Sequence, residues 1–306
     1  MDGNTGSFAQ TIINGELSFT NEVTATGVTS FTGGTLSILG TGTYNADGQF
    51  NGDGGGGTVI FTGAGNLVCS STLDNTFGTL RDDLGTVTKG TVTFDATTGS
   101  QALPDETFHD LTVNNADGLT MANDVQVDGV LDFTDGIITT AANSMIIGGS
   151  GSVTNATDAK HINGNCSKIY NNVGAPAEFN FPVGDGARLR PIKLIVPAGA
   201  STTFKVKYFH TKSTAFGGAS IANGGGVNGT LNHISGYMDP DTQPPGGAST
   251  GGYYFNITRP IGSKDAQLYL EWSSADPWGT GGGATESLRF ARYNGANWVS
   301  AGGTLG

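Results

Sequence analysis

Short bursts of alternating apolar residues, separated by turn residues, run through residues 108–153. The bursts pair Leu111 with Val113, Leu119 with Met121, Val125 with Val127 and Leu131 with Phe133. Period-two alternation that is interrupted every six to ten residues or so predicts short β-strands rather than helices. A strand this short cannot bury its apolar side alone, and it becomes stable only by stacking on similar neighbours. The stretch therefore predicts the coils of a β-solenoid.

A loose repeat extends this pattern toward the N-terminus. Its copies are GVTSFTGG (27–34), GTVIFTGAG (57–65), GTVTFDATTG (90–99) and GVLDFTDG (129–136). The spacing of roughly 30 to 40 residues predicts coils with loops of variable length. We expect the aromatic residues of these strands to point inward, and the predicted core residues are Phe19, Phe31, Phe61, Phe94 and Phe133. The glycine-rich span Tyr44–Gly57 is predicted to be an exposed excursion.

The pattern changes after about Cys166, where the strands become longer and more aromatic. The longer strands include EFNFPVG, RPIKLIVP, TTFKVKYFH, GYYFNITRP and AQLYLEWSS. Six or seven such strands with turns between them predict an antiparallel β-sandwich. We therefore predict an all-β protein with a β-solenoid-like repeat domain over residues 1–170 and a β-sandwich domain over residues 171–306.

Charge and hydropathy exclude two classes of partner. The chain has 26 acidic and 14 basic residues, a net charge of −12. An acidic surface repels phosphate backbones, so we expect no nucleic-acid partner, whereas cations and neutral glycans are compatible with it. No stretch approaches the ~18 consecutive apolar residues of a transmembrane helix, so we expect no membrane insertion.

Cys69 and Cys166 leave two interpretations open. A disulfide closing this long loop would stabilise the fold and would suit an extracellular setting. The alternative is two small buried residues in separate strands, because sequence alone does not bring their Cα atoms within bonding distance.

Carboxylates on loops offer a calcium site. Asp47 and Asp53 lie on a glycine-rich excursion, and Asp239 and Asp241 flank Pro240. Ca²⁺ accepts carboxylate and carbonyl oxygens on flexible loops. The alternative is that these residues only favour turn geometry and solubility, in which case we expect no cofactor.

Catalysis is the less favoured expectation. The four histidines have no partner at metal-ligand spacing, and no GxSxG motif occurs. A polysaccharide lyase or hydrolase would need paired carboxylates, or Ca²⁺ with a lysine or arginine base, on one face of the coils. Asp128, Asp132 and Asp135 could line such a face, although alternation makes them equally suited to solvent. For glycan binding, Trp278 follows Asp276-Pro277 in a loop and is the best exposed aromatic contact, unless it plugs the sandwich.

Residues 90–306 resemble a known group of proteins. The segment TFHDLTVNNADGLTMANDVQVDGVLDFTDGIITT is similar to the repeated segment of large secreted surface proteins of the Bacteroidota. HINGNCSKIYN, FNFPVGDGARLRPIKL, YYFNITRP and LRFARYNGANWVSAGG follow in the order that this family uses. Cys166 and Tyr254 depart from its pattern, where an apolar or small residue and a tryptophan are usual. The resemblance implies export by the type IX system and a role in adhesion, gliding or matrix formation.

Taken together, these features predict an extracellular or cell-surface structural protein, not an enzyme, that serves as an adhesive building block of a fibre or surface layer. We expect self-association, either head-to-tail as a filament or within a larger surface chain. The alternative is a carbohydrate-binding adhesin module, followed by a polysaccharide lyase or hydrolase.

Overall fold

The described part of the protein consists of β-strands, turns and loops. A computed structural model describes residues 5–6, 10–13, 15–51, 57–72, 79–82, 90–209, 254–270, 291–293 and 298–300, and these residues include no helix. The chain divides into two compact units, Met1–Lys207 with Ile257–Tyr269, and Tyr208–Asn256 with Leu270–Gly306. The first unit contains a solenoid of about seven turns.

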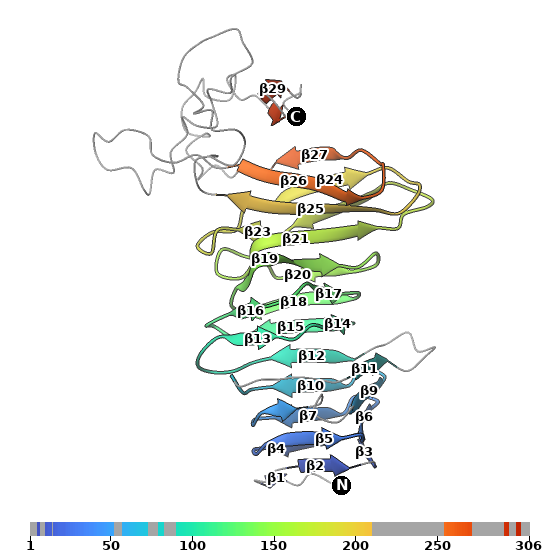
Figure 1. The fold of residues 1–306 in the computed structure, drawn as a ribbon, viewed down its shortest axis with the longest axis vertical. Coiled ribbons are helices and arrows are strands. Elements are labelled where there is room, and N and C mark those ends of the chain that lie inside the picture. Colours follow the sequence, from blue (N-terminus) through green and yellow to red (C-terminus); the bar gives the residue numbers. More distant parts are fainter. Residues whose placement is uncertain are drawn as a thin grey trace, which may run out of the picture. The chain divides into compact units, whose positions relative to one another are not determined.

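One side of the solenoid is an eight-stranded parallel sheet, here called sheet A, to which each coil contributes one strand (Figure 1). Its strands in spatial order are β1 (Thr5–Gly6), β4 (Glu22–Ala25), β7 (Thr43–Ala46), β10 (Asn66–Cys69), β12 (Thr91–Phe94), β15 (Asp110–Asn114), β18 (Val130–Asp135) and β20 (Ser152–Thr154). This spatial order is also the order along the chain. Each coil is therefore laid down next to the one before it.

Two smaller parallel sheets complete the early coils. Sheet B contains β2 (Gln10–Ile13), β5 (Thr29–Thr32) and β8 (Phe50–Asn51), and sheet C contains β3 (Glu16–Phe19), β6 (Thr35–Leu39), β9 (Thr58–Thr62) and β11 (Thr79–Asp82).

In the later coils a nine-stranded sheet, sheet D, forms the rest of the wall. Its parallel part contains β13 (Gln101–Leu103), β14 (Thr107–Phe108), β16 (Leu119–Met121), β17 (Val125–Val127), β19 (Ile138–Ile147) and β21 (Ile162–Tyr170). The long strand β19 pairs with β16 near its start and with β17 near its end. β19 therefore spans two sides of its coil, whereas in the preceding coil each of these sides has a strand of its own, β16 and β17.

The core is a set of stacked, in-register side chains. Along sheet A the register aligns Val23, Tyr44, Leu67, Val92, Leu111 and Leu131, one from each coil. All six are at most 6% exposed. Full burial of a large apolar side chain contributes ~1.5–3 kcal/mol, so the stack stabilises the coils cumulatively. Among the predicted core residues, Phe19, Phe61, Phe94 and Phe133 are confirmed as buried, whereas the side chain of Phe31 lies outside the described part of the structure.

A coil is shorter than the predicted repeat. The register pairs Thr5 with Thr24 in an early coil and Asn66 with Thr91 in a later one, so each pair of numbers spans one full turn of the chain. The predicted repeat spacing was wrong because the repeat segments lie on different sides of the coil. The copy at 27–34 contributes to sheet B, the copy at 57–65 to sheet C, and the other two to sheet A.

The predicted excursion at Tyr44–Gly57 was also wrong where the structure describes it. Tyr44 and Phe50 are fully buried, and their rings meet edge to face with centroids 6.2 Å apart. The Tyr44 hydroxyl hydrogen-bonds to the Thr29 hydroxyl at 2.9 Å. The glycine count of this span concealed the alternation of Tyr44 and Ala46, which pack in register with the neighbouring coils.

A tight glycine turn forms a corner within one coil. Gly136, between β18 and β19, has φ +88°, and a β-carbon there would overlap the carbonyl oxygen of Asn115 in the coil below. Only glycine combines that backbone conformation with so close an approach.

After β21 the strands run in mixed directions. β25 (Thr202–Phe209) pairs antiparallel with β21, β26 (Tyr254–Ile261) follows β25 in the sheet order, and β23 (Val183–Gly184) pairs with the start of β21. A separate sheet contains β22 (Ala177–Phe181), β24 (Ile192–Val196) and β27 (Gln267–Leu270). In the second unit, β28 (Ala291–Tyr293) pairs antiparallel with β29 (Trp298–Ser300). The predicted fold class, all-β with a β-solenoid first and antiparallel strands later, is confirmed, whereas the domain boundary after residue 170 stays a prediction.

Candidate functional site: an acidic concavity on the coils

A concavity opens on the outside of the solenoid where sheet C gives way to sheet D. Its volume is about 360 Å³, and it is open to solvent on one side. β11 is the last strand of sheet C and β14 starts the next stack on this side, so Leu80 of β11 faces residues of sheet D across the gap. The lining residues are Leu80, Asp105, Glu106, Thr107, Asp124, Gln126 and Ile146. We call this site the acidic concavity.

Three carboxylates dominate its electrostatics. Burial, with a smaller contribution from the negative charge of Asp105, raises the pKa of Glu106 from 4.5 to about 7. Asp124 accepts a hydrogen bond from the backbone N–H of Ser144 at 2.7 Å, which fixes its side chain at the rim. The site therefore combines Glu106, whose pKa lies near neutrality, with Asp124, whose side chain is held by a backbone hydrogen bond.

The remaining lining groups suit a polar ligand. Gln126 donates a hydrogen bond to Asp128 at 2.8 Å, and Thr107 is exposed. Ile146 is half-buried and supplies a small apolar surface. Hydroxyl, amide and carboxylate groups beside an apolar patch bind polyhydroxylated or cationic groups.

The carboxylates predicted from sequence do not converge on this site. Asp132, in β18 of sheet A, accepts hydrogen bonds from Thr154 and Asn155, and Asp135 is exposed. Asp128 is tied to Gln126 at the edge of the concavity. Sequence reasoning missed Asp105, Glu106 and Asp124. The available signal was that each lies one or two residues before a short strand of adjacent coils.

The predicted calcium ligands are not brought together among the described residues. Asp47 is exposed in the turn after β7, whereas Asp53, Asp239 and Asp241 lie outside the described residues. Within the described ranges, no group of three or more His, Cys, Asp or Glu side chains is arranged to hold a metal ion. Trp278, the predicted glycan contact, also lies outside the described residues.

The structure does not pair the two cysteines. Cys69 in β10 and Cys166 in β21 are both fully buried free thiols. They lie four coils apart, which at ~4.8 Å per strand is about 19 Å along the stack, whereas a disulfide needs Cα atoms within ~7 Å. Burial raises the pKa of both thiols. The described fold therefore favours the alternative of two small buried residues.

A buried lysine closes the last parallel coil. Lys168 points inward from β21, in register with Ile147 on one side and Phe204 on the other. Its Nζ donates hydrogen bonds to the carbonyl oxygens of Gly148 (2.5 Å), Gly149 (3.1 Å) and Gly151 (2.7 Å). Burial lowers its pKa from 10.5 to about 8. The ammonium group thus supplies hydrogen-bond donors to the carbonyl oxygens of a turn that packs against apolar side chains.

A buried histidine joins two loops. The Nδ1 of His161 lies 3.3 Å from the carbonyl oxygen of Thr157, and its Nε2 accepts a hydrogen bond from the backbone N–H of Gly186 at 3.2 Å. This pattern requires a neutral ring with the proton on Nδ1. Burial accordingly lowers the pKa of His161. Its role is to fix the loop before β21 to the loop after β23.

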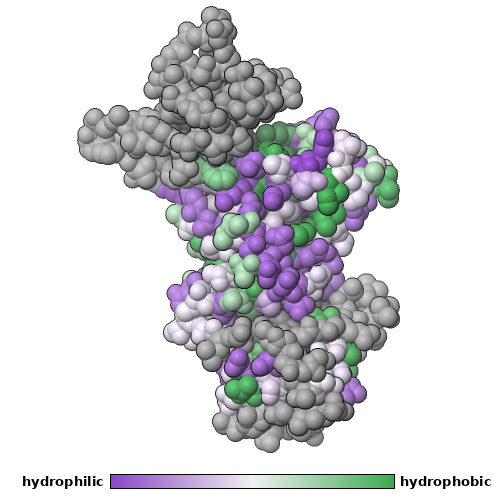
Figure 2. Space-filling view, viewed as in Figure 1, coloured by the Kyte–Doolittle hydropathy of each residue, from purple (hydrophilic) through white to green (hydrophobic). Residues whose placement is uncertain are grey.

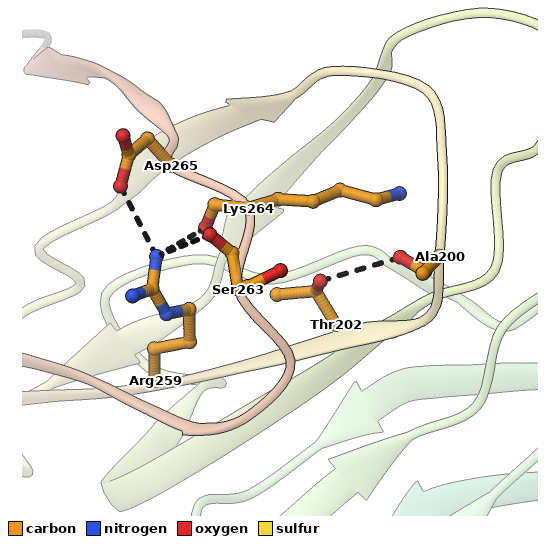
Figure 3. A network of polar contacts seen from close by, with 6 residues as sticks. All are labelled: Ala200, Thr202, Arg259, Ser263, Lys264 and Asp265. Carbon is orange, nitrogen blue, oxygen red and sulfur yellow. Dashed lines mark hydrogen bonds and ion pairs between the residues drawn. The ribbon is translucent and has the colours of Figure 1, made fainter.

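An arginine fixes the loop between β26 and β27 (Figure 3). Arg259 Nη1 donates to the carbonyl oxygens of Ser263 (3.1 Å) and Lys264 (2.6 Å) and contacts Asp265 at 3.1 Å. Thr202, close by in β25, donates to the carbonyl oxygen of Ala200 at 3.3 Å. All of these contacts stay within turns. The network therefore stabilises the loop between β26 and β27 rather than presenting groups to a ligand.

On the face drawn in Figure 2, hydrophilic residues gather over the middle of the coloured region, with smaller hydrophobic areas beside them. The described part of the chain includes no helix that is long and apolar enough to cross a lipid bilayer. Comparisons of the chain with protein-family models, with curated protein sequences and with solved structures find no match.

Proposed function

We propose that this protein is an extracellular structural protein of the cell surface, an adhesive building block in which the coil stack acts as a stiff spacer without a catalytic role. The observation that supports the proposal is the continuous register of sheet A, in which eight strands from successive coils pair in chain order. Such a stack transmits load through backbone hydrogen bonds and packed side chains along its whole length. The family resemblance of residues 90–306 supports the surface location.

Labelling of intact cells tests the location. Antibody raised against residues 90–209 should label unpermeabilised cells of the source organism. Permeabilised cells and an antibody against an intracellular protein serve as controls. Native protein that becomes accessible only after permeabilisation would contradict the proposal.

Single-molecule stretching tests the spacer. One coil is the chain between two paired residues of sheet A, such as Asn66 and Thr91. Release of a coil of roughly 20–25 residues, at up to ~3.6 Å per residue, lengthens the chain by about 7–9 nm. We expect a series of extensions of this size at reproducible forces. A chain that extends smoothly, without force peaks, would not serve as a load-bearing spacer.

A second candidate function is glycan binding, which the acidic concavity favours. Asp105, Thr107 and Gln126 line this concavity, and their side chains carry groups that form hydrogen bonds with sugar hydroxyls. A glycan array should then give signals that weaken when Gln126 is replaced by Ala. Retention of full signal in that variant, together with loss in Trp278→Ala, would move the binding site to the region around Trp278.

A further inference from the structure

Two loops meet over a fully buried histidine at the start of β21. The first loop, residues 157–160, is closed by backbone hydrogen bonds in both directions between its first and last residues, at 2.8 and 3.0 Å. The second, residues 185–189, is a turn closed by a bridge between Gly184 and Leu189. We call it the 185–189 turn. His161 is 0% exposed, follows the first loop directly and contacts the second.

Two hydrogen bonds join the loops to each other. The backbone N–H of Gly186 donates to His161 Nε2 at 3.2 Å, and the backbone N–H of Leu189 donates to Asp158 Oδ1 at 2.9 Å. The ring also packs against the backbone of Gly184, where a β-carbon would lie 2.6 Å from Cδ2 and Nε2 of the ring. The Nε2 side of the ring is therefore in close contact with the backbone that it holds.

The contact with Gly186 requires that Nε2 carries no proton. Nδ1 lies 3.3 Å from the carbonyl oxygen of Thr157, which can only accept, so the neutral ring has its proton on Nδ1 and accepts at Nε2. A second proton, taken from solvent, would occupy the lone pair of Nε2 and would set an N–H of the ring against the N–H of Gly186. Protonation therefore turns an attractive contact into a repulsive one.

The groups around the ring determine how readily it takes up that proton. Burial lowers the pKa of His161, and this effect is partly opposed by backbone carbonyls of the first loop and by the carboxylates of Asp158 and Asp185, one from each loop. The Lys160 Nζ donates to the Thr134 carbonyl on β18. β19, which pairs with β21, has no ionisable residue. The remaining basic residues next to the ring's two loops are Arg188 and Arg190.

We propose that His161 is a pH-sensitive fastener: in mildly acidic solution its ring takes up a proton from solvent, and the 185–189 turn opens away from the 157–160 loop while the coils stay folded. The proton moves from water to Nε2, and the Gly186 N–H is released to solvent. The inference does not depend on the proposed structural function, because it concerns two loops rather than the role of the coil stack.

The pairing of the strands keeps the opening local. β23 pairs with β21 only through Ile162 and Asn163, whereas β25 pairs with β21 along Asn165–Tyr170 among the described residues. Below the turn, the backbone N–H of Arg190 donates to the carbonyl oxygen of Val183 at 2.7 Å. The turn therefore opens on a base that does not involve His161.

The driving force is the difference in proton affinity between the closed and the open state. In the open state the ring is in water and takes up its proton near 6.5, the ordinary pKa of histidine. In the closed state the pKa is lower, so a falling pH favours opening. Because one proton is taken up per opening, the opening constant rises by at most about tenfold per pH unit.

Hydrogen exchange of the full chain between pH 7.5 and 5 tests the proposal, when it is resolved by NMR for each amide and divided by the intrinsic exchange rate at each pH. We expect the protection of the Gly186 and Leu189 amides to fall by about threefold or more between pH 6.5 and 5. The amides of β19 and of residues 165–170 should keep their protection. NMR titration of the His161 ring in the wild type should give a midpoint below 6.5.

A variant separates titration from packing. His161→Gln keeps a side-chain oxygen that can accept from Gly186 but cannot titrate, so the protection of Gly186 should no longer depend on pH. His109→Gln, a change at a half-buried histidine outside the two loops, is the matched control and should keep the wild-type dependence.

Four results would overturn the proposal. They are a ring that titrates at or above 6.5, wild-type protection of Gly186 that is constant with pH, a His161→Gln chain that keeps the wild-type dependence, and an equal loss of protection in β19, which indicates global unfolding. If His161→Gln leaves the turn open at every pH, the wild-type titration and exchange decide the question without it.

Discussion

Replacement of Lys168 by methionine tests how the last parallel coil is closed. Methionine fills the space between Ile147 and Phe204 but cannot donate hydrogen bonds to the turn at 148–151. The carbonyl oxygen of Gly148 keeps the hydrogen bond from the Gly151 N–H at 3.0 Å, and Gly149 is exposed to water. The buried carbonyl of Gly151, however, loses its 2.7 Å donor.

The expected loss of stability follows from the hydrogen bonds that these three carbonyl oxygen atoms lose. A buried carbonyl left without a donor costs ~1–3 kcal/mol, and each of the two other lost hydrogen bonds costs ~0.5–1.5 kcal/mol. Relief from burying an ammonium group and the apolar contacts of methionine offset part of this loss. We expect the free energy of unfolding to fall by about 2–4 kcal/mol relative to the wild type.

Two measurements check this expectation. Urea denaturation followed by circular dichroism gives the change in stability, and hydrogen exchange at the amides of Gly151 and Ser152 reports on the turn itself. Lys160→Met is the matched control, because among the described residues the Lys160 Nζ makes a single hydrogen bond, an exposed one to the Thr134 carbonyl at 3.3 Å. We expect a change within ~0.5 kcal/mol for this control. A Lys168→Met protein with wild-type stability and unchanged exchange at both amides would refute the reasoning.

Three further changes test other features. Because the folded state raises the pKa of Glu106 to about 7, it binds more protons than the unfolded state between pH 4.5 and 7. Wild-type stability should fall as the pH rises through that window, and Glu106→Gln should flatten the dependence of the melting temperature on pH. The lowered pKa of His161 has the opposite sign, since the unfolded state takes up the proton first as the pH falls through 6.5. The stability advantage of the wild type over His161→Asn should therefore shrink from pH 7.5 to 5, and parallel curves would contradict the assigned role. Gly136→Ala should lower the free energy of unfolding by about 2–4 kcal/mol through φ strain and overlap with Asn115, while Gly174→Ala, which meets no atom within 4 Å, should change it by less than ~0.5 kcal/mol in the same denaturation assay.

The alternation of apolar and polar residues was sufficient to predict the strands and which side of each strand is buried. Leu111, Val113, Val125 and Val127 alternate with polar residues, and all four are fully buried. The number of residues in a coil could not be predicted from the sequence, because the same Phe-containing motif fits any of the three sides of a coil. Only the pairing register, which sets Asn66 beside Thr91, reveals where one coil ends and the next begins.

The acidic concavity could not be predicted for a similar reason. Leu80, Asp105 and Asp124 come from three successive coils, and they meet only because one sheet stops and another begins between them. Lys168, in contrast, was within reach of sequence reasoning. Alternation along β21 places Cys166, Lys168 and Tyr170 on the same buried side, so a charged residue in that series marks an inward-facing ammonium group.

The antiparallel pairing of β25 with β21 gives the coil stack a starting point for assembly of the chain. The strands β22, β24 and β25 are joined by short connections, so their contacts can form before any distant part of the chain arrives. Once formed, they present the edge of β21 as a template on which β19, then β17 and β16, can add one after another. Folding should therefore proceed coil by coil from this nucleus toward the N-terminus. The coils near Thr5 should be the last to gain protection from hydrogen exchange and the first to unfold locally.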